Sequence, residues 1–417
     1  MIRIALKELR AGHVLAKSIY RDTGEIMLSA GYRMTPDVSI KLKEIGIDKI
    51  WVQEQGLEDL ESEDLVSEVT INQCILLLRK TVLDFRAKVG LINISSEERP
   101  PSPEKILSKP EELKEALNIS AFKKVAANIY QELKKADPSL LRITCARSLG
   151  NFYQQQSIDC AIIAALLAKR YSFTPDEIED MIFAVLLMDI GYILLPEHIL
   201  APGAKLSLDD LELKKQHTDY GFEILRICNV SLICANVALQ HHERQDGGGY
   251  PRKLVGNNRP PVRVTGPAAK GTINRYAEIA AVALYYISLI APPPNIPAQT
   301  PINSIKFLVR LSGAKLNSAV VETLLSMIPI YTAGDRIMVT SDSQDEFVGF
   351  TGIVLRSNSR EQNRPSVVLI YNKNGEKIPP KLLNLWERKD TEIREAKLGE
   401  GVAEEATEKM PEEIEVL

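Results

Sequence analysis

Two adjacent histidines, His241 and His242, are the residues of this sequence best suited to metal chemistry. The chain holds only five histidines in 417 residues, so a neighbouring pair stands out. Imidazole nitrogens bind transition metals, and carboxylates serve as ligands or orient the imidazole rings. Two carboxylates follow closely, Glu243 and Asp246, and we expect them to orient the rings. A surface helix end closed by a glycine is the alternative, but the combination favours a metal site.

The residues after this pair form a short segment that can approach a ligand closely. Three consecutive glycines end at Gly248 and Gly249, and Tyr250 and Pro251 follow them. Glycine has no Cβ, so its backbone can turn sharply and can lie against a bound molecule. We therefore expect these four residues to contact a substrate.

The full run from His241 to Pro251 reads HHExxDGxGYP and resembles the signature of the HD-GYP phosphodiesterases. That family hydrolyses the bacterial second messenger cyclic di-GMP at a centre of two or three metal ions. The resemblance implies an all-helical central domain of the HD type and a metal-dependent hydrolase as its ancestor. Whether the chemistry is retained depends on the individual ligand positions.

One group of metal ligands is complete by this resemblance. Asp189, in the segment AVLLMDIGYI, corresponds to the Asp of the family's LLHDIGKI. His217 corresponds to the His of its His-x-x-x-Gly-x-x-Leu pattern, and His241 and His242 complete the group. Three imidazoles and one carboxylate suit a single divalent ion, with Zn, Fe or Mn as candidates.

The second group has lost its ligands by the same resemblance. Gln156 stands where the family has the first-helix His, Met188 where it has the His of the His-Asp pair, and Leu284 where it has the late Asp. Tyr192 replaces a Lys and removes a positive charge beside the phosphate. A second ion about 3.5–4 Å from the first normally helps to clamp the attacking and leaving oxygens. We therefore expect no two-metal centre and hydrolysis that is lost or strongly reduced.

Three functions remain open. The first is a degenerate HD-GYP signalling protein that binds cyclic di-GMP or a signalling partner protein without turnover. The second is a single-metal phosphodiesterase acting on cyclic di-GMP or a related phosphoester, with Asp189 as a catalytic residue. The third is a scaffold that brings its flanking domains to a partner. Helical domains of the family often pair, so a homodimer is expected by analogy.

The composition is that of an ordinary globular protein. Hydrophobic residues make up 45% and charged residues 25% of the chain. The net charge of −4 gives no electrostatic reason to expect nucleic acid or a membrane surface as partner. The sequence lacks a signal peptide and an apolar stretch long enough for a membrane span. Five scattered cysteines without CxxC spacing are typical of reduced thiols, so we expect a cytoplasmic protein.

The pattern along the chain predicts a multidomain, mainly α protein. Alternating short apolar pieces and turns predict a small α/β or β-rich N-terminal domain, with a helix starting at Thr35 and Pro36. Helical spacing dominates the middle, β-type runs follow it, and the end is rich in Glu. The expected parts are an N-terminal domain (1–54), a linker helix and flexible loop (55–112), the degenerate HD-GYP helical domain (113–329), a small β appendage (330–390) and an acidic disordered tail (391–417).

Overall fold

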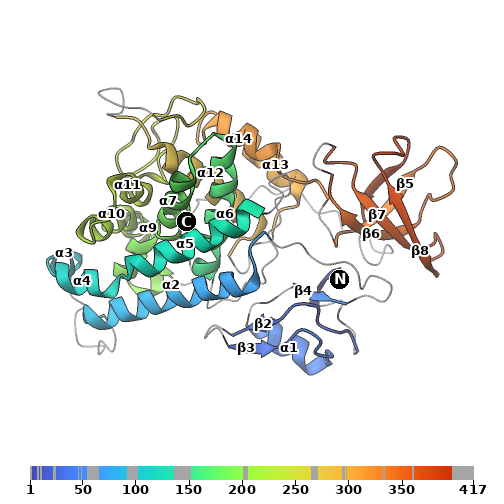
Figure 1. Cartoon of the computed structure of the whole chain (residues 1–417), viewed down its shortest axis with the longest axis horizontal. Coiled ribbons are helices and arrows are strands. Elements are labelled where there is room, and N and C mark those ends of the chain that lie inside the picture. The colour runs from blue at the N-terminus through green and yellow to red at the C-terminus, as the bar shows by residue number, and fades with distance from the viewer. Residues whose placement is uncertain are drawn as a thin grey trace.

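Helices fill the middle of the chain and strands occupy both ends in the structure, a computed structural model (Figure 1). The expected multidomain, mainly α architecture with a central helical domain is confirmed. The residues that the structure describes are 2–6, 9, 12–21, 25–45, 47, 49–53, 65–91, 102–135, 152–200, 205–263, 271–293, 296, 298–331, 334–358 and 361–396.

The N-terminal unit consists of two short antiparallel strand pairs and one helix. β1 (Ile2–Ala5) pairs with β4 (Lys49–Val52), and β2 (Ile19–Tyr20) pairs with β3 (Ile26–Leu28). Helix α1 (Pro36–Glu44) begins after Thr35 with a proline in its first turn, as the sequence predicts. Proline is favoured there because its missing N–H has no partner in that turn.

The helical domain is built around three helices that bury most of their surface. α6 (Phe152–Arg170) buries every residue from 155 to 168, and α7 (Pro175–Leu186) and α12 (Arg275–Ile290) pack against it. A helix that is apolar all round belongs in the centre of a domain. The other described helices of this part are α2 (Glu68–Lys88), α3 (Pro103–Leu107), α4 (Pro110–Ala116), α5 (Ile119–Lys135), η3 (Ile190–Leu194), α8 (Glu197–Leu200), α9 (Leu208–Lys215), α10 (His217–Ile227), α11 (Leu232–Gln240), α13 (Pro301–Leu311) and α14 (Ser318–Leu325).

Helix α2 corrects the expected linker. It packs against α4, α5 and α6, and its Cys74 and Phe85 are fully buried in the main helical core. Its apolar residues therefore face the domain rather than bridging two domains. Helices α3 and α4 also occupy part of the segment predicted to be a flexible loop. The remainder of that prediction, residues 92–101, lies outside the described residues.

The C-terminal unit is a five-stranded antiparallel sheet with the order β8-β7-β6-β5-β9. The β-type runs predicted over residues 332–339, 349–355 and 366–371 overlap three strands, which begin at Arg336, Thr351 and Ser366. Gly352 is required in the second of these strands, because a Cβ there would lie 2.1 Å from the carbonyl oxygen of Val368. The strands are β5 (Arg336–Ser341), β6 (Thr351–Arg356), β7 (Ser366–Tyr371), β8 (Lys377–Asn384) and β9 (Glu392–Glu395).

Strand β9 corrects the expectation of a disordered tail from residue 391. It pairs with β5, and the carbonyl oxygen of its Ile393 accepts a hydrogen bond from the hydroxyl of Tyr331. Thr391 just before it is fully buried and donates to Asp342 at 3.0 Å. The rest of the predicted tail, residues 397–417, lies outside the described residues.

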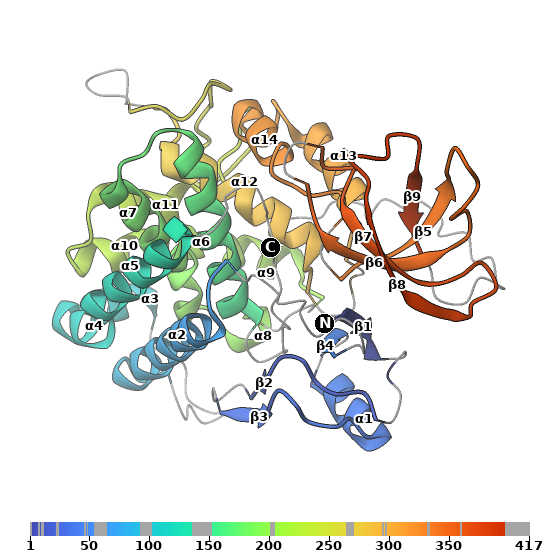
Figure 2. The ribbon, with the colours of Figure 1, turned by 45° about the vertical axis from the view of Figure 1, so that its right-hand side comes forward.

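The two ends of the chain share one apolar cluster. Ile4, Leu15 and Val52 of the N-terminal unit pack together with Ile353 and Val368 of the C-terminal sheet. Figure 2 shows the N-terminal strands lying beneath the sheet, beside the helical domain. The N-terminal unit and the C-terminal sheet are therefore packed on each other, although the helical domain separates them in sequence.

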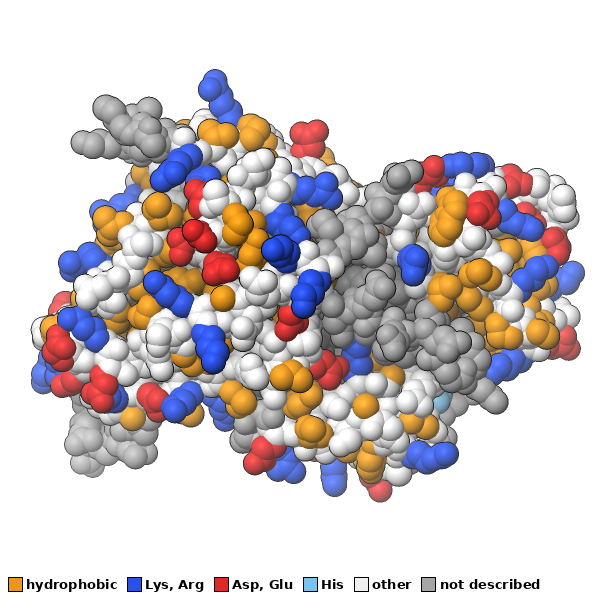
Figure 3. All heavy atoms as spheres, in the orientation of Figure 1, with side chains coloured by type: hydrophobic (Ala, Val, Ile, Leu, Met, Phe, Trp, Pro, Cys, Tyr) orange, Lys and Arg blue, Asp and Glu red, His pale blue; other side chains and the backbone are white. Residues whose placement is uncertain are grey.

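The described surface mixes both signs of charge. On the face drawn in Figure 3, basic and acidic side chains are interspersed over the helical part. The described cysteines (Cys74, Cys160, Cys228, Cys234) are buried and form no disulfide with one another. None of the described helices combines the length and the apolar character that a membrane crossing requires.

Candidate metal centre

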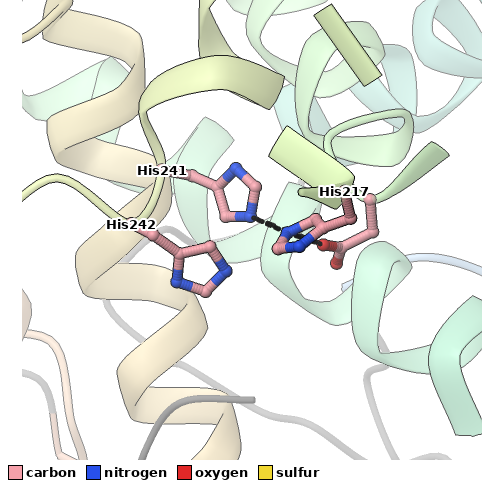
Figure 4. Close-up of side chains that lie close together, drawn as sticks. His217, His241 and His242 are labelled. Carbon is pink, nitrogen blue, oxygen red and sulfur yellow. Dashed lines mark hydrogen bonds and ion pairs between the residues drawn. The ribbon is translucent and has the colours of Figure 1, made fainter. Parts of the chain in front are cut away.

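Four side chains with metal-binding atoms converge at the ends of helices. Asp189 lies between α7 and η3, His217 is the first residue of α10, and His241 follows the last residue of α11. Their ligand atoms all lie within 4.8 Å of one another. Figure 4 shows the three labelled imidazole rings around one small space, with the carboxylate beside them. We call this group the histidine cluster: Asp189, His217, His241 and His242.

The distances within the cluster are those of ligands around one ion. The Nε2 atoms of His217 and His241 are 3.3 Å apart. Oδ1 of Asp189 lies 3.5 Å from the first of these nitrogens and 3.4 Å from the second. Ligand atoms around a tetrahedral ion with bonds of about 2.0–2.1 Å are roughly 3.3–3.4 Å apart. The donors of Asp189, His217 and His241 therefore fit three ligand positions around a single cation, and the donor of His242 lies within 4.8 Å of them.

Backbone carbonyl groups fix two of the rings. Nδ1 of His217 donates to the carbonyl oxygen of Lys214 at 2.7 Å, and Nδ1 of His241 donates to that of Val237 at 3.0 Å. Because a carbonyl oxygen can only accept, each Nδ1 must carry a proton, and each Nε2 of a neutral ring is then a lone-pair donor. Both lone pairs face the centre of the cluster, as metal coordination requires.

Burial favours the neutral form of two of the imidazoles, whereas neighbouring groups favour the ionised form of the carboxylate. Burial lowers the pKa of His217 to about 3 and that of His242 well below its usual value. Burial raises the pKa of Asp189, but its interactions with His241, His217 and the ammonium group of Lys214 outweigh burial, so this pKa lies below its usual value. Neutral imidazoles with an ionised carboxylate form the donor set of a transition-metal site.

His242 supports this fit independently. Its Nε2 is buried and has no hydrogen-bond partner within the described part of the chain. An orphaned buried nitrogen costs stability unless something satisfies it. A cation held by the cluster would do so. The ring stacks on Tyr250 with centroids 4.8 Å apart, which holds the nitrogen in place.

The loop that carries the glycines is folded back on itself. Glu243 accepts the backbone N–H groups of Arg252 and Leu254 at 2.7 and 2.8 Å. A Cβ on Gly249 would lie 2.5 Å from the backbone nitrogen of Arg244, so only glycine fits there. This closure brings Tyr250 against His242. Contact of Gly248, Gly249, Tyr250 and Pro251 with a substrate stays a prediction.

The expected role of Glu243 and Asp246 needs correction. The carboxylate of Glu243 holds the loop, as above, while that of Asp246 accepts from Arg244 Nε at 3.0 Å and from the N–H of Gly248 at 2.9 Å. The carbonyl groups of Lys214 and Val237 orient rings instead. Backbone N–H groups of the loop bind these carboxylates. A sequence motif does not reveal which N–H groups will lie within reach.

Gln156, Met188 and Leu284 are buried, and we call them the ligand-poor region. Nε2 of Gln156 lies 3.5 Å from the Oγ of Ser288, one turn beyond Leu284 on α12. Helices α6 and α12 thus bring two of the three positions to one side of the domain. The exposed fraction is 0% for Met188 and 2% for Leu284, as expected of core residues. None of the three is an efficient ligand for a transition metal.

Sequence reasoning missed a cation beside the cluster. Lys214 is 5% exposed, its Nζ lies 5.8 Å from the centroid of the Tyr192 ring, and its charge helps to lower the pKa of Asp189. The positive charge expected to be lost at Tyr192 is therefore replaced in part from helix α9. The available signal is the position of Lys214 only three residues before His217, since the two lie on either side of the junction between α9 and α10.

Comparison with known proteins gives one family and several relatives. Residues 146–262 match the HD domain family. The cyclic di-GMP phosphodiesterase response regulator RpfG of Xanthomonas campestris is 30% identical over 168 residues, covering 39% of this chain and 40% of that protein. The cyclic di-GMP phosphodiesterase PA4108 of Pseudomonas aeruginosa is 20% identical over 361 residues, covering 83% of this chain and 79% of that protein.

One solved structure, described as a HDG"Y"P protein from Bdellovibrio bacteriovorus, is similar over 78% of this chain and 98% of its own. Its TM-score is 0.39 and its sequence identity is 14%.

Proposed function

We propose that this chain, whose residues 146–262 match the HD domain family, is a degenerate HD-GYP signalling protein. It holds one divalent ion on the histidine cluster and binds cyclic di-GMP or a signalling partner protein. Its capacity to hydrolyse a phosphodiester is lost or strongly reduced. Zn, Fe and Mn all suit the donor set.

The observation that carries the metal part is the geometry of the four donors. Three imidazole nitrogens and one carboxylate oxygen lie within 4.8 Å of one another, with separations of 3.3–3.5 Å between the donors of Asp189, His217 and His241. The ion would stabilise the site, polarise a bound oxygen and lower the pKa of bound water. The chain's own residues hold the rings, exclude water and keep Asp189 ionised.

The ligand-poor region supports the loss of turnover. A second ion beside the first would need donors from Gln156, Met188 and Leu284, and these offer an amide, a thioether and a hydrocarbon. All three are buried in the packed domain, so water cannot easily replace the missing ligands. Without the second ion, attacking and leaving oxygens are not both clamped.

The ligand is proposed from the relatives and from the loop beside the cluster. Both relatives described above are named as cyclic di-GMP phosphodiesterases. Tyr250 lies against His242 in the loop, and Nζ of Lys215 lies 5.8 Å from the centroid of its ring, so an aromatic ring and a cation lie beside the site. A homodimer that presents this loop to a partner protein is compatible with the same proposal.

A single-metal phosphodiesterase is the second candidate, and Lys214 favours it. A buried cation near Asp189 could stabilise charge on a phosphoryl oxygen, which is the part of the chemistry that a second ion would otherwise supply. In that case Asp189 would take part in catalysis as a metal ligand.

The test is elemental analysis of the purified full chain together with a cyclic di-GMP hydrolysis and binding assay on the same sample. One ion per chain, binding and no linear product is the expected result. His217→Ala should lose the ion, while Gln156→Ala, the matched control, should keep it. Two ions with turnover would overturn the degenerate reading, and one ion with turnover would favour the second candidate. A chain that holds no ion would favour the third function, a scaffold that brings its flanking domains to a partner.

A further inference from the structure

Tyr192 carries a buried hydroxyl group that nothing in the described part of the chain satisfies. The residue is 7% exposed, and its hydroxyl has no hydrogen-bond partner. Such a group weakens the folded state unless a partner binds to it. Phenylalanine would fill the same space without this cost, so the packing of the ring does not account for the hydroxyl.

The ring of Tyr192 is held against the histidine cluster. It stacks on the ring of His217 with centroids 4.2 Å apart and planes 22° from parallel. The ring of Tyr153 also contacts the ring of Tyr192, with the two centroids 5.7 Å apart. The unsatisfied hydroxyl therefore belongs to a side chain that lies directly on a proposed metal ligand and has little freedom to move.

The charges around Tyr192 favour an anion. The cluster contains one carboxylate, that of Asp189, beside its three imidazoles. A divalent cation and Lys214, whose Nζ lies 5.8 Å from the Tyr192 ring centroid, would together exceed the negative charge of that carboxylate. A site with surplus positive charge and an unused donor is complementary to an oxyanion, since a phenol keeps its proton near neutral pH and donates through it.

We propose that the hydroxyl of Tyr192 donates a hydrogen bond to a phosphoryl oxygen that binds beside the metal ion. The ligand class is a phosphate or phosphoester, and Tyr192 fixes its orientation rather than reacting. The inference rests on the proposed single-metal site and deepens it. No covalent step is involved.

The experiment measures inorganic phosphate binding by isothermal titration calorimetry on the full chain loaded with one equivalent of Zn²⁺. Tyr192→Phe keeps the stacked ring and removes the donor. We expect phosphate affinity to fall roughly ten- to hundredfold, the range for a hydrogen bond to a charged group. Metal content should stay the same, and the thermal midpoint should be unchanged or higher because an unsatisfied group is removed.

Tyr171→Phe is the matched control. Its hydroxyl donates to the carbonyl oxygen of Ala319 at 2.7 Å, at the far end of α6. This variant should lose stability and keep its phosphate affinity, the opposite of the result expected for Tyr192→Phe.

The outcomes separate this inference from the proposed function. An ion in both proteins with equal phosphate affinity would overturn the role of Tyr192 and leave the metal site standing. A metal-loaded chain that binds no phosphate would do the same. A lowered midpoint without a change in affinity would show a structural hydroxyl and would also refute the inference. A wild-type chain that binds no ion would refute both.

Discussion

The histidine cluster and the ligand-poor region lie in the same domain but differ in where their side chains sit on the helices. The cluster occupies helix ends, where Lys214 and Val237 offer carbonyl oxygens to the rings. Gln156 and Leu284 sit within α6 and α12, two helices buried along most of their length. When an apolar side chain replaces a polar one inside a buried helix, it can pack in the core. Removing a side chain of the cluster instead leaves its hydrogen-bond partners unsatisfied. For Gln156 and Leu284, this difference in location supports the proposed loss of a second metal position.

The largest effect is expected when a carboxylate is introduced into the ligand-poor region, because this tests whether the two regions differ as described. Leu284→Asp would place a charge at a position 2% exposed on α12. We expect a loss of about 3–5 kcal/mol in the free energy of unfolding of the helical domain, because the charge has no counterpart there. Urea denaturation followed by circular dichroism measures it. Leu284→Met is the control and should cost less than about 1.5 kcal/mol. A loss below 1 kcal/mol for the Asp variant would mean that the region is hydrated.

The next effect concerns the cluster. His242→Phe keeps an aromatic ring against Tyr250 but removes the unsatisfied Nε2. Metal affinity should fall at least about 100-fold, since even the groups that merely orient ligands are worth 10–100-fold. Competition with a fluorescent chelator measures this. Equal affinity in the variant and the wild type would exclude His242 as a ligand.

A smaller effect is expected where the backbone supports the cluster. A Cβ at Gly191 would lie 1.9 Å from the carbonyl oxygen of His217, so Gly191→Ala must push η3 away from α10. We expect a loss of about 1–3 kcal/mol in unfolding free energy, as for other overpacked sites, with weaker metal binding. Gly221→Ala is the matched control on the facing helix, because its Cβ would meet Ala238 at 3.3 Å. Similar losses in both variants would argue against a special role for Gly191.

The smallest effect is expected for an apolar substitution in the ligand-poor region. Gln156→Leu replaces a buried amide whose contact with Ser288 is long, at 3.5 Å. The unfolding free energy should change by less than about 1 kcal/mol, because little hydrogen bonding is lost and apolar contact is gained. Metal content should remain at the wild-type value. A variant without metal would show that Gln156 belongs to the site.

Much of the architecture was predictable because it depends on residues that are close together in the sequence. The start of α1 at Thr35 and Pro36 and the strand beginning at Ser366 follow from turn chemistry and alternation. The convergence of Asp189 with the histidines was expected from a family motif, and the structure brings these residues together.

The missed features depend on partners distant in sequence. Strand β9 lies in a Glu-rich segment without aromatic residues, and only its pairing with β5 makes it a strand. The burial of Lys214 and the engagement of Glu243 with backbone amides depend on how loops close around the site. Composition describes a segment alone, so it cannot supply such contacts.

The apolar cluster shared by the two ends of the chain has a consequence for biosynthesis. Ile4 and Leu15 are made first, but their partners Ile353 and Val368 emerge more than 300 residues later. At about 5–20 residues per second, the N-terminal unit waits roughly 17–70 seconds with its apolar face uncovered. During that interval the growing chain offers a surface that a chaperone, or the C-terminal sheet of a neighbouring finished chain, can cover.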